Sequence, residues 1–249
     1  MVERGPGSCR AARLLAGCVV SLGLLLASPC CLGDDLWGGS LGLTSDYLVR
    51  GISRSNDQAA LQLDLHYVNT SGFVAGIFAS NTQIDPYEPK DVMISGFIGF
   101  AWTVGDDWRS RILANYYAYP WNAFGSKYNY DELDLDVAYQ DWLGVSFSYS
   151  TNSPRYLSYR GLVGEAAESA ELDLQRPVFG KLSATGGVGY YHLEGPDAAG
   201  YAYWSVGAAY ALAPVSLTLS YVDTTAGAKT LFYNAAATGR WIATIIWRF

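Results

Sequence analysis

The sequence has no cysteine after Cys31 and no long apolar run after Ala27. The first absence excludes a disulfide scaffold, a thiolate metal site and a cysteine nucleophile from the rest of the chain. The second excludes a membrane-spanning helix there, which needs about 20 apolar residues. Histidine is also scarce, because only His66 and His192 are present and they lie far apart in the sequence. We therefore expect no metal site and no cofactor.

Catalytic motifs are missing as well. Residues 38–42 read Gly-Gly-Ser-Leu-Gly, but they fall inside the first expected strand and not at the strand-to-helix turn that a nucleophile elbow needs, and the sequence contains no phosphate-binding loop. A serine near His66 could still act as a nucleophile in an outer-membrane hydrolase, but no local motif selects one. We expect no catalytic residues and no enzymatic activity.

Residues 1–33 have the pattern of a secretory signal peptide. Arg4, Arg10 and Arg13 precede an apolar stretch over residues 14–27, which is short for a membrane span. All four cysteines lie in this segment, and Cys30 and Cys31 leave a lipoprotein open, although the preceding Pro29 disfavours it. We expect export through the general secretory route, cleavage near residue 33, and one domain over residues 34–249.

Basic residues are outnumbered in the expected mature chain. Without the first 33 residues, 13 basic and 22 acidic residues remain, which gives a formal net charge of −9. Nucleic-acid binding proteins present a basic surface, so the sequence predicts no nucleic-acid partner.

What the chain does contain is alternation. Apolar and polar residues alternate with a period of two in about twelve segments, which is typical of β-strands and not of helices. The expected strands cover residues 37–49, 61–67, 73–80, 92–104, 108–119, 132–139, 145–150, 170–175, 182–191, 204–210, 215–221 and 240–249.

The connections between these segments alternate in length. Connections after the even strands are short, such as 69–72 and 105–107, and those after the odd strands are long, such as 50–59, 151–167 and 222–239. Outer-membrane barrels have short periplasmic turns and long outer loops. An even number of strands then puts both termini in the periplasm.

The last strand carries the most specific pattern. Every second residue is apolar or aromatic and the chain ends on phenylalanine, which is typical of the closing strand of an outer-membrane barrel. These outward-facing positions are Trp241, Ala243, Ile245, Trp247 and Phe249. We expect this strand to engage the barrel-assembly machinery, and its apolar face to meet outer-membrane lipid.

Alternation alone does not decide which face points outward. A soluble barrel or sandwich would turn the same apolar face inward. Clustering of Trp and Tyr near strand ends, the terminal Phe249, and long loops on one side only favour the membrane barrel. The predicted fold is an all-β, antiparallel, transmembrane barrel in the outer membrane of a Gram-negative cell.

Residues 46–53, with the sequence Asp-Tyr-Leu-Val-Arg-Gly-Ile-Ser, resemble the opening motif of the TorF-type porins, a bacterial family. The resemblance continues through Gln62, Tyr67, Gly72 and Asn81 and is strongest over the first fifty mature residues. It implies a single outer-membrane barrel with a pore role and an undefined solute. Arg50, at the expected outer end of the first strand, either reaches into the pore mouth or anchors the loop.

Charged residues on the polar faces of the strands are candidates for the pore lining. Folding the hairpins brings Arg111 near Asp134 and Asp136, and Asp46 near Asp64. Six acids against four bases predict a weak preference for cations. The candidates are Asp46, Arg50, Asp64, Arg109, Arg111, Asp134, Asp136, Glu171, Asp173 and Arg248.

The function predicted from the sequence is a porin-like channel for passive diffusion of small hydrophilic solutes or ions. Twelve strands lie between small barrels filled by side chains and wide sixteen-stranded porins. A non-conducting structural or adhesion barrel is therefore the first alternative, and folded-in loops would support it. An outer-membrane hydrolase is the second, and the oligomeric state stays open.

Overall fold

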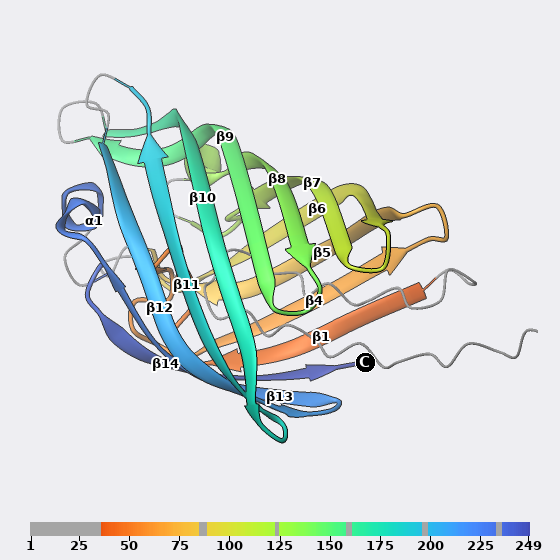
Figure 1. Ribbon diagram of the computed structural model, residues 1–249. Coiled ribbons are helices and arrows are strands. Elements are labelled where there is room, and N and C mark those ends of the chain that lie inside the picture. Colours follow the sequence, from red (N-terminus) through yellow and green to blue (C-terminus); the bar gives the residue numbers. More distant parts are fainter. Residues whose placement is uncertain (1–35, 85–88, 123–124, 158–160, 196–198, 233–235) are drawn as a thin grey trace, which may run out of the picture.

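The computed structural model describes residues 36–84, 89–122, 125–157, 161–195, 199–232 and 236–249. The expected signal peptide and all four cysteines lie outside these residues. Twelve long strands form the wall of one barrel (Figure 1): β1 Leu36–Thr44, β4 Ala60–Val68, β5 Phe73–Thr82, β6 Asp91–Val104, β7 Trp108–Ala118, β8 Tyr130–Tyr139, β9 Leu143–Leu157, β10 Gly161–Phe179, β11 Leu182–Leu193, β12 Ala199–Leu212, β13 Val215–Thr224 and β14 Arg240–Arg248.

The barrel closes because β1 pairs on one side with β4 and on the other with β14. Every strand of the barrel pairs antiparallel with its two neighbours in the wall. Closure leaves no strand edge unpaired, which is the condition for a β-structure to span a lipid bilayer. The predicted twelve-stranded antiparallel barrel is confirmed.

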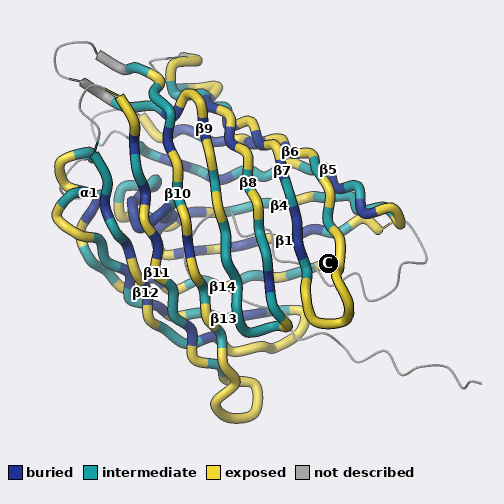
Figure 2. The backbone as a smooth tube through the Cα atoms, turned by 45° about the horizontal axis from the view of Figure 1, so that its top comes forward, coloured by how far each residue is buried: buried dark blue, intermediate teal, exposed yellow. Residues whose placement is uncertain are grey.

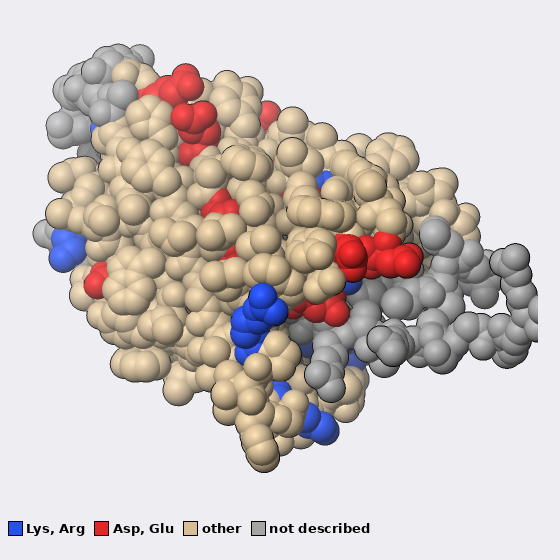
Figure 3. Space-filling model, in the orientation of Figure 1, with Lys and Arg blue, Asp and Glu red and all other residues tan. Residues whose placement is uncertain are grey.

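The two faces of the wall differ as the period of two requires. On β8, Leu133 and Leu135 are 49 % and 36 % exposed on the outside, whereas Glu132 and Ala138 are buried on the inside. Buried and exposed residues alternate along the strands in Figure 2. The outer face is apolar, and most of the side drawn in Figure 3 carries neither acidic nor basic residues.

Aromatic residues cluster near both ends of the outer face. Amphipathic aromatic rings are suited to the two membrane–water interfaces. At the short-turn end the ring contacts are Trp37–Tyr67, Trp108–Tyr139 and Trp247–Phe249, and at the long-loop end they are Trp204–Tyr221 and Tyr221–Trp241.

The predicted alternation of short and long connections fails between β9 and β10, where only residues 158–160 separate the strands, and the first strand is shorter than predicted. β9 and β10 continue through most of the segment that the sequence predicts as the loop 151–167, because Pro154 is accommodated in the strand pairing opposite Gly164. β1 ends at Thr44 and not at Val49, because the chain then turns into the barrel.

Helices are minor elements. The structure describes one α-helix, α1 Ala226–Leu231, in the connection between β13 and β14, and one 3-10 helix, η1 Gly125–Tyr128. Within the described residues, no helix has the length and apolarity needed to cross a membrane.

Candidate functional site

A loop folded into the barrel is the main feature of the lumen. This loop, residues 45–59, is called here the inward hairpin, and it contains the two short strands β2 Leu48–Val49 and β3 Ile52–Ser53. Arg50 and Gly51 form the turn between them with φ angles of 51° and 76°, as a two-residue type I′ hairpin requires. A Cβ on Gly51 would lie 2.6 Å from Cγ2 of Thr224, so glycine also permits close packing against the wall.

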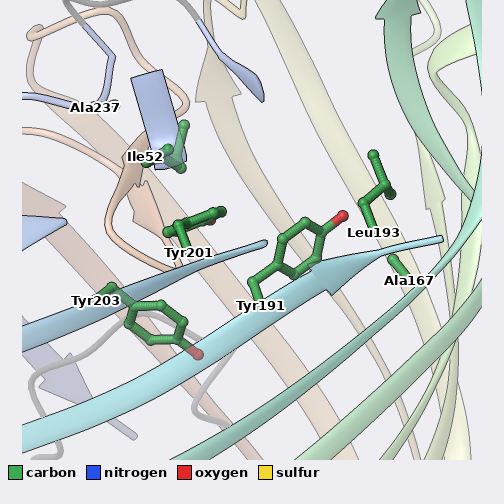
Figure 4. Close-up of a cluster of buried hydrophobic side chains, with 8 residues drawn as sticks. Ile52, Ala167, Tyr191, Leu193, Tyr201, Tyr203 and Ala237 are labelled. Carbon is green, nitrogen blue, oxygen red and sulfur yellow. The ribbon is translucent and has the colours of Figure 1, made fainter. Parts of the chain in front are cut away.

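Apolar side chains of the inward hairpin contact the wall in three directions. Tyr47, Leu48 and Ile52 are 2 %, 1 % and 2 % exposed. Figure 4 shows Ile52 beside Tyr201, within the cluster that also contains Tyr191 and Tyr203 from β11 and β12. Tyr47 packs among residues of β6, β7 and β8, and Leu48 packs against β13 and β14. The hairpin therefore occupies the long-loop half of the lumen.

Polar contacts fix the two ends of the inward hairpin. The hydroxyls of Ser53 and Ser55 each donate to Asp46 Oδ1 at 2.7 Å. Arg240 on β14 donates to Asp46 Oδ2 at 2.6 Å and also pairs with Asp57. Asp46 thus holds the base of the hairpin to the barrel wall.

Arg50 links the tip of the hairpin to the opposite wall. Its Nη2 lies 2.7 Å from Oε2 of Glu132 on β8, and both residues are buried. Counted from β1 through β4, β8 is the sixth of the twelve strands around the barrel, so this ion pair crosses the lumen. The Tyr201 hydroxyl donates to the Arg50 carbonyl oxygen at 3.0 Å.

Burial also sets the charge of the phenols beside the hairpin. Burial raises the pKa of Tyr47 and that of Tyr119, which follows β7. Both phenols therefore stay neutral at physiological pH. They contribute packing and hydrogen-bonding groups to the lumen and no charge.

Most of the predicted lining residues lie on the inner face, where many have partners. Arg111 Nη2 lies 2.7 Å from Asp136 Oδ2, so the predicted pairing is confirmed. The other contacts are Asp64 with His66 at 2.6 Å, Glu171 with the Tyr203 hydroxyl at 2.9 Å, Arg248 with Ser216 at 2.9 Å, and Arg109 with Asp141 at 2.5 Å near a short turn.

Two predicted positions are wrong. Arg50 does not lie at the outer end of the first strand, because the chain turns inward after Thr44 and makes Arg50 part of a turn. Asp46 is not near Asp64, since Thr44 already pairs with Ala60, and Asp64 pairs with Ser40 toward the short turns. Arg50 is a loop-anchoring residue, one of the two roles that the sequence leaves open.

Sequence reasoning missed Glu132, the tyrosines of β11 and β12, and Asn115. Leu48 and Ile52 gave a usable signal, since bulky apolar residues in a long loop are expected to find a buried surface. Nothing local to the sequence indicates the partner of Arg50, because Glu132 lies 82 positions further along.

Below the hairpin the lumen is not uniformly packed. Val74, Phe97 and Leu113 form a buried apolar cluster on the inner face of β5, β6 and β7. Inner-face side chains of β8, β9 and β10 keep partial exposure: Asp134, Asp136, Ser146, Ser148, Ser169 and Asp173. Partial exposure also persists on the facing strands β14, β1 and β4, at Thr244, Ser40, Gln62 and His66.

Metal-binding residues are sparse in the lumen. In the described part of the chain, no three His, Cys, Asp or Glu side chains come together as a metal site would need. Asp64 and His66 form a pair, but no serine hydroxyl of the described residues is hydrogen-bonded to His66.

A closed antiparallel wall, an apolar outer face and aromatic clusters near both ends are the features of transmembrane β-barrels. The chain belongs to a bacterial protein family of unknown function (Gcw_chp), which matches residues 35–247. At the level of a porin-like bacterial barrel the sequence resemblance is supported, whereas the TorF-type assignment stays a prediction.

Solved structures share the architecture at low sequence identity. The NanC porin has a TM-score of 0.51 and 10 % identity, with 85 % of this chain and 98 % of that chain covered. The KdgM porin has a TM-score of 0.51 and 12 % identity, with 85 % of this chain and 99 % of that chain covered. The COG4313 outer membrane channel from Pseudomonas putida F1 has a TM-score of 0.52 and 12 % identity, with 88 % of this chain and 96 % of that chain covered. No curated protein matches the sequence.

Proposed function

We propose that the protein is a porin-like channel of the bacterial outer membrane, in which the inward hairpin narrows the path for small hydrophilic solutes or ions. The observation that carries this proposal is the uneven filling of the lumen. The inward hairpin fills part of the lumen at the long-loop end, while polar side chains on β8 to β10 keep contact with solvent. Solutes would diffuse passively past these polar groups.

The proposal includes a location and an assembly route. The apolar outer face would contact outer-membrane lipid. The barrel-assembly machinery would recognise the last strand, and export would use the general secretory route. Chemistry on the solute forms no part of the proposed role. The likeness to porin and channel structures supports the fold on which this proposal rests.

A non-conducting structural barrel is the second candidate. It is favoured by the same hairpin, because Tyr47, Leu48 and Ile52 leave little free space at the level where they pack. Adhesion or structural barrels need no continuous path. Solute flux separates the two candidates directly.

Liposome swelling with purified protein tests the proposed channel. We expect permeation by monovalent ions and by solutes of glycerol size, and exclusion of disaccharides, since the inward hairpin narrows the long-loop half of the lumen. A matched preparation of heat-unfolded protein controls for leakage. Absence of flux for every solute would favour the non-conducting barrel.

Topology can be tested by cysteine labelling on whole cells. Glu194 lies exposed on the long-loop side and Lys181 lies exposed in the turn between β10 and β11. With long loops outside, Glu194→Cys should react with an impermeant maleimide and Lys181→Cys should react only after cell lysis. The reverse pattern would invert the proposed orientation and place both termini outside.

A further inference from the structure

Three neighbouring strands present acids and hydroxyls on one part of the inner wall. In the strand register, Asp136 on β8 lies opposite Ser146 on β9, and Ser146 lies opposite Glu171 on β10. Two residues along each strand toward the long loops, Asp134 lies opposite Ser148, and Ser148 lies opposite Ser169. These residues, together with Asp173 on β10, are called here the acidic wall.

Two acidic residues of β8, in or beside the acidic wall, form ion pairs with arginine. On β8, Glu132 binds Arg50 and Asp136 binds Arg111, each at 2.7 Å. Asp134 lies on the same face between these two pairs. Among the described residues its carboxyl group forms no ion pair, so no arginine is bound to it.

A second observation comes from Asn115 on β7. Asn115 is only 4 % exposed, and its Nδ2 donates to Asp134 Oδ2 at 2.7 Å. The remaining oxygens, Asn115 Oδ1 and Asp134 Oδ1, are buried and have no hydrogen-bond partner within the described structure. Buried acceptors are nearly always satisfied in folded proteins. The Ser148 hydroxyl, which lies opposite Asp134 in the strand pairing, has a single hydrogen to donate, so the pair of acceptors leaves room for a further donor.

The chemistry of that donor follows from the two acceptors. A hard metal ion such as Ca²⁺ takes about 6–8 oxygen ligands, and one carboxylate with one amide oxygen falls well short. An ammonium or guanidinium group carries charge and several N–H donors, and charge-assisted hydrogen bonds of this kind are the strong ones. The acidic wall would concentrate such cations in the confined lumen.

We infer that Asp134 and Asn115 form a docking point for small organic cations that carry an ammonium or guanidinium group. The inference rests on the proposed channel function for its physiological meaning, since it names the solute class that the lumen favours. The docking point lies below the inward hairpin, where Asp134 keeps partial exposure and Asn115 is buried beside it.

Equilibrium binding of arginine amide to the purified barrel in detergent tests the docking point. We expect binding in dilute salt, no binding of glutamate, and roughly tenfold weaker binding of arginine amide by Asp134→Asn, because one charge-assisted bond is lost. Asn115→Leu keeps the carboxylate but removes the second acceptor, and should weaken binding less. Asp141→Asn removes the same charge outside the acidic wall and should bind like the unmodified protein.

The outcomes separate this inference from the channel proposal. Folding of each variant is checked by its heat-dependent shift on gel electrophoresis. Failure of the unmodified protein to bind, or equal binding by folded Asp134→Asn, overturns the docking point whatever the flux assays give. Binding that depends on Asp134 without flux in liposomes would keep the docking point and overturn the channel.

Discussion

Leu135→Arg should lower the free energy of unfolding from lipid vesicles by about 2–4 kcal/mol. Leu135 lies in the middle of β8 on the outer face, between Ile112 of β7 and Phe147 of β9. A guanidinium there would enter the hydrocarbon layer without a partner. Urea titration with tryptophan fluorescence as readout measures the change.

Ser146→Arg is the matched control. Ser146 lies on the inner face of β9, with Asp136 on one side and Glu171 on the other, so the same side chain would meet carboxylates. We expect its effect to stay below about 1 kcal/mol, in the range of ordinary polar substitutions. A larger loss for Ser146→Arg than for Leu135→Arg would mean that the apolar face does not meet lipid.

Arg50→Ala should widen the channel and destabilise the barrel. Removing one partner of a buried ion pair costs about 3–5 kcal/mol, because the other charge is left uncompensated. Glu132 would be left buried, and the tip of the inward hairpin would lose its link across the lumen. We expect a several-fold increase in single-channel conductance together with the loss of stability.

Two controls isolate the hairpin's role. Arg155→Ala removes an arginine whose ion pair with Glu165 joins adjacent strands and does not cross the lumen, so conductance should not change. The double variant Arg50→Met with Glu132→Leu replaces the pair by apolar groups, which is often near neutral for stability, and should restore a small conductance. Unchanged conductance in Arg50→Ala would show that the hairpin does not limit the path.

The wall of the barrel could be predicted from the sequence because its rule is local. In a closed sheet each strand carries its own period of two, so Leu133 and Leu135 against Asp134 and Asp136 already separate the outer face from the inner one. The register of β8 with β9 also follows from one short turn, which places Asp134 opposite Ser148.

The contents of the lumen could not be predicted in the same way. The segment 45–59 has the length and composition of an outer loop, and only tertiary packing against the tyrosines of β11 and β12 turns it inward. The contact that fixes its tip joins positions 50 and 132 across the barrel. No periodic pattern specifies such a contact, since it depends on the finished barrel.

The predicted charge balance changes for the same reason. Asp46 and Arg50 belong to the inward hairpin, and Arg111 is taken up by Asp136. Counting six acids against four bases therefore overstates how many charges a solute can meet. The weak cation preference stays a prediction, and its basis narrows to the acidic wall.

Single-channel conductance of the unmodified protein in planar lipid bilayers tests the central claim most directly. A porin-like barrel narrowed by the inward hairpin should give stable steps, smaller than those of Arg50→Ala, with a cation preference in dilute salt that fades near 1 M, where screening shortens to about 3 Å. Silent bilayers for the unmodified protein would contradict the channel and leave a non-conducting barrel.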